Sequence, residues 1–352
     1  MFYKDLPGQS IFPQAARTDA GSILMIALWS LCLLASFALT LGYKARQEIF
    51  FIQKLEEREK LRLISEAGLK KAVATIKNMD WDEVLACALK DPWNNDPEAY
   101  SGVTVGQGQF DIFHNDHDEY TQTSKLRWGL VDEERKININ KADMTVLRNF
   151  FKLALGLDDT GAQNLAASIV DWRDADSELS VPSGSAEDSY YRGLPYPYEA
   201  KDADFEFSEE ILLVKDMNAE IFSRIKDYIT IFGSGKINVN TAPEVTLLSL
   251  GLPSHVVDYI LSIRSGDDRE EGTEDDIVFE STSGIISTIK QFYDLSQQDV
   301  AVIQAAIEQK GLVTKSVFFM ASCRARLFNR KNYQDSYCVM NNKGKILSWR
   351  IF

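Results

Sequence analysis

The chain has 352 residues, of which 45% are hydrophobic, and its formal net charge at pH 7 is −14. This composition indicates globular domains, and the length allows two domains or one large composite. The acidic balance argues against a nucleic-acid surface, which needs Lys and Arg to displace counterions from phosphates. No nucleophile–base pair and no phosphate-cradling loop stands out, so we expect a protein that is not an enzyme.

One long apolar segment lies near the start of the chain, at residues 23–42. Its only ionisable side chain is the thiol of Cys32, and at 1.5 Å per residue it spans roughly the 30 Å of a bilayer core. The sequence therefore predicts a transmembrane helix over residues 22–42. Residues 1–21 are polar and end in small residues, which fits a leader removed ahead of the helix. An uncut signal anchor is the alternative.

Helical periodicity continues beyond the membrane segment. Apolar residues recur at threes and fours from Ile49 to Ile76, which predicts one continuous helix to about Met79. Strand patterns follow, at residues 103–113, 126–131, 136–140, 316–328, 336–340 and 346–352. The region between the two sets of strands is helical. This order of elements predicts an α+β fold in which a helical domain is inserted into an α/β domain.

The helical region contains an internal repeat. Lys-Ile-Asn-Ile-Asn-Lys-Ala at residues 136–142 matches Lys-Ile-Asn-Val-Asn-Thr-Ala at residues 236–242. Each copy is followed by Leu-Gly-Leu and by a helix that ends in Arg173 or Arg264, which predicts two helix-hairpin units. Such hairpins can bind phosphate at a glycine turn, so a membrane-anchored DNA-binding protein is an alternative. Because acidic residues outnumber basic ones around these turns, we favour a packing role.

The richest candidate site is an acidic stretch within residues 171–188. Asp-Trp-Arg-Asp-Ala-Asp-Ser-Glu at residues 171–178 is followed by Glu187 and Asp188. Carboxylates two apart on a loop can share one cation, and Ca²⁺ takes six to eight oxygen ligands. The alternative is a solvated acidic loop. We expect a solvated loop for the second acidic run, at residues 267–276, in which Arg269 is intermixed.

Two further groups of possible ligands or partners are weaker. His114 and His117 have no third ligand nearby, so we expect a surface turn there and not a transition-metal site. Cys323 and Cys338 lie in two predicted C-terminal strands. They could form a disulfide if the chain faces an oxidising compartment.

Several stretches together resemble the K subunit, a minor pseudopilin of type II secretion systems. They are residues 21–24, 131–140, 171–176, 186–191, 195–196 and 237–242. The likeness covers most of the chain. It implies a pilin-like domain with an antiparallel sheet, made of residues 43–140 and 312–352. Residues 141–311 would then be an all-helical insert with two helix-hairpin, SAM-like repeats. The resemblance also implies that prepilin peptidase cuts between Gly21 and Ser22.

The resemblance implies a role as well. Pilin-like subunits usually carry Glu at the fifth position after the cut, where it neutralises a neighbour's N-terminal ammonium in the filament core. Here, as in the K subunit, that position is Ile26, and a bare charge in such a core costs several kcal/mol. The implied role is a tip subunit that starts or caps a short pseudopilus with the I and J subunits and the secretion platform. A minor pilin of a type IV pilus is a further alternative.

Calcium in the helical insert is a further implication of the resemblance. The expected ligands are Asp174, Asp176, Glu178 and Glu187, with Asp171 and Asp188 in reserve. The implied location is the inner membrane, crossed once, with the C-terminal domains in the periplasm.

Overall fold

A computed structural model describes residues 20–118 and 123–352. The chain divides into two units, residues 1–59 and 60–352. Most of the predicted leader lies outside the described residues. Helix α1 (Ala20–Asn78) begins within the first unit and ends in the second.

In the first unit, α1 is a regular helix whose side chains are exposed. It is the one helix in the described ranges that is long and apolar enough to cross a membrane. Ile26 lies on it and is 66% exposed. The single apolar helix expected from the sequence is therefore present as a candidate membrane anchor.

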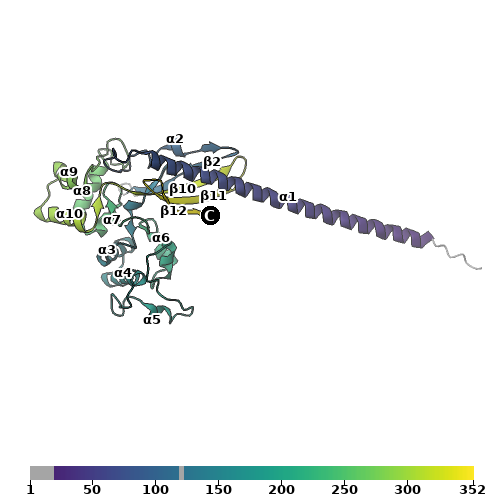
Figure 1. The fold of residues 1–352 in the computed structure, drawn as a ribbon, viewed down its shortest axis with the longest axis horizontal. Helices are drawn as coiled ribbons and strands as arrows, with labels where there is room; N and C mark the ends of the chain where they lie inside the picture. The colour runs from purple at the N-terminus through teal and green to yellow at the C-terminus, as the bar shows by residue number, and fades with distance from the viewer. Residues whose placement is uncertain (1–19, 119–122) are drawn as a thin grey trace, which may run out of the picture. The chain divides into compact units, whose positions relative to one another are not determined.

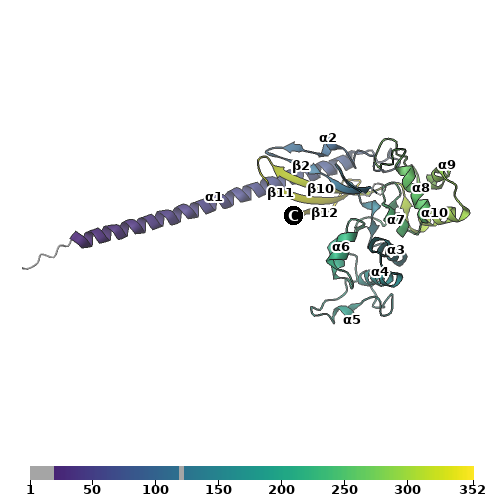
Figure 2. The ribbon, with the colours of Figure 1, turned by 180° about the vertical axis from the view of Figure 1, so that it is seen from behind.

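In the second unit, the end of α1 packs on a six-stranded sheet of order β1-β2-β10-β11-β12, with β5 also paired to β10. All of these pairs are antiparallel. The strands are β1 (Val103–Val105), β2 (Gly108–Ile112), β5 (Val131–Asp132), β10 (Phe318–Leu327), β11 (Tyr333–Asn341) and β12 (Ile346–Ile351). Gly68 allows the close approach, because a Cβ there would lie 2.5 Å from Cys323 Sγ. Figures 1 and 2 show the sheet from opposite sides.

The two C-terminal cysteines are both free thiols, so the disulfide considered from the sequence is absent. Cys323 pairs with Ser336 across β10 and β11, whereas Cys338 pairs with Ala321. The cysteines are therefore diagonal neighbours, and diagonal Cα atoms in a sheet lie about 7–8 Å apart. That separation is too large for a bridge without backbone movement.

A separate hydrophobic core holds the inserted region together. Its helices are α3 (Met144–Leu155), α4 (Asp159–Arg173), α5 (Asp188–Tyr191), η2 (Ser208–Leu213), α6 (Ala219–Ile225), α7 (Glu244–Ser249), α8 (Ser254–Arg264), η3 (Thr282–Gly284), α9 (Ile285–Phe292) and α10 (Gln297–Gln309). It also contains strands, which the prediction of an all-helical insert missed. Two short parallel pairs close the repeats, β6 (Ile137–Asn138) with β7 (Ile229–Thr230) and β8 (Ile237–Asn238) with β9 (Leu312–Val313).

Smaller elements lie before β1, between β2 and β5, and between β5 and the first repeat. They are α2 (Pro97–Tyr100), the antiparallel hairpin of β3 (His114–Asp118) and β4 (Thr123–Arg127), and η1 (Glu133–Arg135).

The Leu-Gly-Leu sequences form the turns between paired helices. Gly156 ends α3 with φ of 70°, and Gly251 follows α7 with φ of 89°. Glycine adopts this left-handed backbone without the penalty that a Cβ brings. The side chain of Asp158 then caps α4 by accepting a hydrogen bond from Gly161 N at 2.8 Å. The glycines thus serve helix termination.

The repeated Asn residues bind the backbone identically in the two copies. Asn140 Nδ2 donates to Phe205 O at 3.0 Å, and its Oδ1 accepts from Phe205 N at 2.8 Å. Asn240 makes the same two bonds with Phe279, at 3.0 and 2.8 Å. Each Asn therefore pins the far end of the loop that follows the second helix of its repeat.

The repeated arginines also act on the backbone. Each lies at the C-terminal end of the second helix of its repeat. Each donates to two backbone carbonyl oxygens close in sequence to the repeated Asn. The acceptors are Ile139 and Ala142 for Arg173, and Val239 and Ala242 for Arg264. The repeat found in the sequence is thus a structural motif.

We expect Asn240→Ala to lower the free energy of unfolding by about 2–3 kcal/mol, because the buried N–H and C=O of Phe279 lose their partner. Asn240 is 2% exposed, so water cannot replace it. Urea unfolding of residues 43–352 measures the change. Asn342→Ala, at a half-buried turn position, is the control and should stay within about 0.5 kcal/mol. Equal stability of the two variants would contradict the stabilising role of the hydrogen bonds between Asn240 and Phe279.

Candidate metal centre

The acidic loop of the first repeat is held at both ends by aromatic contacts. It leaves α4 at Asp174, whose N–H donates to Val170 O at 3.0 Å, and it enters α5 at Glu187. Trp172 and Tyr191 flank these two points and pack edge to face, with ring centroids 5.1 Å apart. Both rings are buried, so the contact fixes where the two ends of the loop meet.

Three carboxylates converge where the ends of the loop meet. One ligand oxygen each from Asp174, Asp176 and Glu187 lies within 4.8 Å of the others. Glu187 is only 4% exposed. Its Oε1 atom and the Oδ1 atom of Asp174 are buried without a hydrogen-bond partner in the described part of the chain. Buried carboxylate oxygens normally have a partner, and these two face a third acidic group instead.

The electrostatics of the cluster also indicate a missing positive charge. Burial, followed by the charge of Asp171, raises the pKa of Glu187 to about 7. Burial, followed by the charge of Asp176, raises the pKa of Asp174. The adjacent Arg173 uses its guanidinium on backbone carbonyls.

A hard divalent cation would satisfy both the unpaired oxygens and the repulsion between the carboxylates. The cluster offers only oxygen ligands. The donor set therefore fits Ca²⁺ better than a metal that prefers His or Cys.

Residues 128–234, which include this cluster and the first repeat, match the family model described as type II secretion system (T2SS), protein K. This segment, about a third of the chain, is therefore similar to that family. The family resemblance inferred from the sequence is thereby confirmed.

Curated proteins similar to parts of this chain agree with this match. The type II secretion system protein K of Aeromonas hydrophila is 35% identical over 101 residues, which are 28% of this chain and 30% of that protein. The protein of the same name from Pectobacterium carotovorum subsp. carotovorum is 29% identical over 116 residues, or 32% of this chain and 34% of that protein. The matched segments thus span about a third of each relative.

The fold is similar to that of one chain in a solved structure. This is the crystal structure of the GspK–GspI–GspJ complex from the type 2 secretion system of enterotoxigenic Escherichia coli. The likeness has a TM-score of 0.59 at 15% identity and covers 88% of this chain and 99% of that one. It confirms the predicted fold class, an apolar N-terminal helix with an antiparallel sheet and a helical insert.

The other predicted ligands in the acidic stretch lie outside the cluster. Glu178 is exposed, and its N–H donates to Asp176 Oδ1 at 2.8 Å. Asp171 is fully buried and accepts from Ser180 N at 3.1 Å. Asp188 is occupied by an ion pair with Arg192 at 2.7 Å.

Asp202 is a neighbour of the cluster that the spacing did not single out. Its charge contributes to the raised pKa values of both Asp174 and Glu187. Its backbone N–H donates to Trp172 O at 3.1 Å, which ties it to the end of α4. Only the fold brings this residue, far along the chain, beside the loop.

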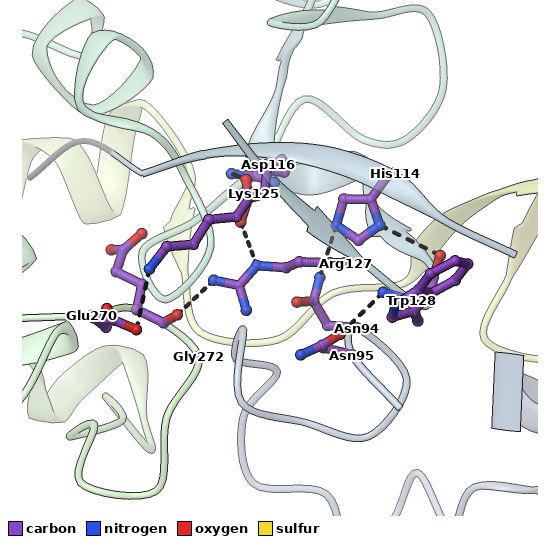
Figure 3. Close-up of polar contacts among 12 residues, drawn as sticks. Asn94, Asn95, His114, Asp116, Lys125, Arg127, Trp128, Glu270 and Gly272 are labelled. Atoms are coloured by element: carbon purple, nitrogen blue, oxygen red, sulfur yellow. Dashed lines mark hydrogen bonds and ion pairs between the residues drawn. The ribbon is translucent and has the colours of Figure 1, made fainter. Parts of the chain in front are cut away.

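His114 is buried, so the expectation of a surface turn is wrong for this residue. It lies on β3 at 8% exposure, with its ring nitrogens 3.4 Å from Asn94 Nδ2 and 3.4 Å from Gly129 O (Figure 3). Burial lowers its pKa to about 4. It is a neutral core histidine at physiological pH. The backbone of His117 continues β3.

The second acidic run is also partly buried, contrary to the expectation of a solvated loop. Glu271, 9% exposed, forms an ion pair with Arg264 at 2.6 Å. Arg127 donates to the backbone oxygen of Glu271 at 2.5 Å and to Asp116 at 2.9 Å (Figure 3). In this repeat, the guanidinium of Arg264 neutralises the buried carboxylate of Glu271.

Proposed function

We propose that this chain is a minor pseudopilin that forms or caps the tip of the periplasmic pseudopilus of a type II secretion system. Its role would be structural, in starting pseudopilus assembly for export across the outer membrane. The match of residues 128–234 to the K family carries the proposal. The fold adds support, because it is similar to that of one chain in the GspK–GspI–GspJ complex of a type 2 secretion system.

The proposal includes the membrane topology. Prepilin peptidase would cut between Gly21 and Ser22, leaving the apolar helix in the inner membrane and the second unit in the periplasm. Support comes from the single apolar helix and from Ile26 on its surface. Because Ile26 offers no carboxylate to a neighbour's ammonium, a place at the end of the filament suits this subunit better than a place within it.

Calcium binding in the first repeat is part of the same proposal. Asp174, Asp176 and Glu187 would hold the ion, and backbone carbonyls and water would complete its shell. Calcium would neutralise the cluster and hold together the two ends of the loop. Two buried oxygens without a partner and the raised pKa of Glu187 support it.

The test is co-purification of the tagged full chain, in detergent, with the I-type and J-type minor pseudopilins of the same system. We expect a complex of the three proteins, because the proposed tip is made by their association. A gel shift with duplex DNA at low salt tests the rival, since phosphate-driven binding is strongest there. DNA binding without association with the other pseudopilins would overturn the proposal.

A further inference from the structure

Strand β12 is a free edge of the six-stranded sheet. It is last in the strand order, and among the described residues it pairs only with β11. The irregularity opposite Val339 and Met340 lies near the start of β12 and leaves residues 348–351 in regular pairing. An unpaired edge of this kind can template the addition of a strand from another chain.

The register identifies which backbone groups point outward. Phe352 N donates to Asp335 O at 2.9 Å, so this pair is hydrogen-bonded. Hydrogen-bonded and non-hydrogen-bonded pairs alternate along an antiparallel ladder. The next residues with no bonds to β11 are therefore Ile351, opposite Ser336, and Trp349, opposite Cys338. Their N–H and C=O groups point away from β11, toward the position of an added strand.

The apolar side chains on this edge are only partly covered by the rest of the chain. Trp349 packs partly buried against the core beneath α1. Ile351 lies on the same face, because its partner Ser336 bonds Ser65 of α1, yet it remains 38% exposed. An added strand with apolar side chains on this face would cover it.

The charge around the edge selects the partner. Of the seven Lys and Arg residues within residues 316–352, Arg324, Arg326 and Arg350 are already paired with acidic groups. By contrast, Lys343 and Lys345, in the turn before β12, are exposed and form no ion pair in the described ranges. An acidic strand would be attracted to these two lysines.

We propose that β12 binds an extended segment of another protein by strand addition. The segment would have apolar side chains on alternate positions and an acidic residue near Lys343 and Lys345. Strand addition gives affinity through main-chain hydrogen bonds and specificity through alternate side chains. Such pairing needs neither calcium nor the first repeat.

The experiment uses the full chain in lipid nanodiscs and a fluorescent synthetic peptide of alternating Val and Thr with two Glu residues at one end. Fluorescence anisotropy measures binding. Ile351→Pro should weaken binding at least about tenfold, because it removes an outward N–H at an edge position where proline is tolerated. Ile351→Ala, which keeps the N–H, should weaken it by less than about threefold.

Two further arms keep the test decisive if the proline variant misfolds. A peptide N-methylated on alternate amides should lose binding to the unaltered chain, because it cannot complete the ladder. The double variant with Lys343→Glu and Lys345→Glu should bind the acidic peptide more weakly at low salt. No binding by the unaltered chain, or equal binding of the N-methylated peptide, would overturn the proposal. Self-association lost in Ile351→Pro would identify a second copy as the occupant and would also overturn it.

Discussion

Removing calcium is expected to lower the melting temperature of residues 43–352 by roughly 4 °C. A ligand at 100 times its dissociation constant stabilises the folded state by about 2.7 kcal/mol, which corresponds to that shift in a protein of this size. Differential scanning calorimetry with calcium and with chelator measures it. The physical reason is the cluster of Asp174, Asp176 and Glu187, whose mutual repulsion returns when the ion leaves.

The pH dependence gives a second readout. In the metal-free protein, the pKa of Glu187 is raised to about 7, above its value of about 4.3 in an unfolded chain. The folded state therefore holds a proton that the unfolded state releases. The associated stability is fully present below about pH 4 and is lost as the pH rises through about 7. The loss of stability on chelation should thus be larger at pH 8 than at pH 5.

Glu187→Gln and Glu178→Gln form a matched pair for this test. Glu187→Gln removes the buried charge, so its melting temperature should no longer respond to chelator. Glu178→Gln changes an exposed residue outside the cluster and should keep the full response. An unchanged response in Glu187→Gln, with no metal detected by mass spectrometry in the unaltered chain, would contradict the calcium site.

Local sequence patterns were sufficient to predict the long elements of the fold. The predicted helix from residue 22 to about Met79 corresponds to α1, because a periodic run without breakers has few alternatives. The repeat could also be predicted from the sequence. Asn140 and Asn240 occupy equivalent positions in the two copies, because each must bond the backbone of a Phe, at Phe205 or Phe279.

Long-range partners explain what the sequence did not reveal. His114 is buried, and its ring contacts Asn94 and Gly129, which come from other segments of the chain. In the acidic loop, the two-residue spacing relates Asp174 to Asp176, but Glu187 joins them only because Trp172 packs on Tyr191. Spacing along a chain fixes neighbours within one turn, whereas convergence across a loop depends on the packing that closes it.

Asp132→Ala is expected to be the most damaging single change in the second unit. Asp132 is fully buried at the end of β5, between the sheet and the insert. Its carboxylate accepts hydrogen bonds from Thr241 Oγ1 and Ser316 Oγ at 2.6 Å each, from Asn238 Nδ2 at 3.1 Å and from Glu134 N at 2.8 Å. The donors come from the second repeat, from the connection between β9 and β10, and from η1.

Replacing the carboxylate by a methyl group leaves several of these donors buried without a partner. Each unsatisfied buried group costs about 1–3 kcal/mol, so we expect a loss of about 3–5 kcal/mol in the free energy of unfolding. Urea unfolding of residues 43–352 checks the value. Asp204→Ala removes an exposed carboxylate paired with Lys141 and should cost at most about 1 kcal/mol. Because Asp132 joins the sheet to the second repeat, its loss should also separate their unfolding transitions. A single cooperative transition at unchanged stability would show that the two cores are held together without it.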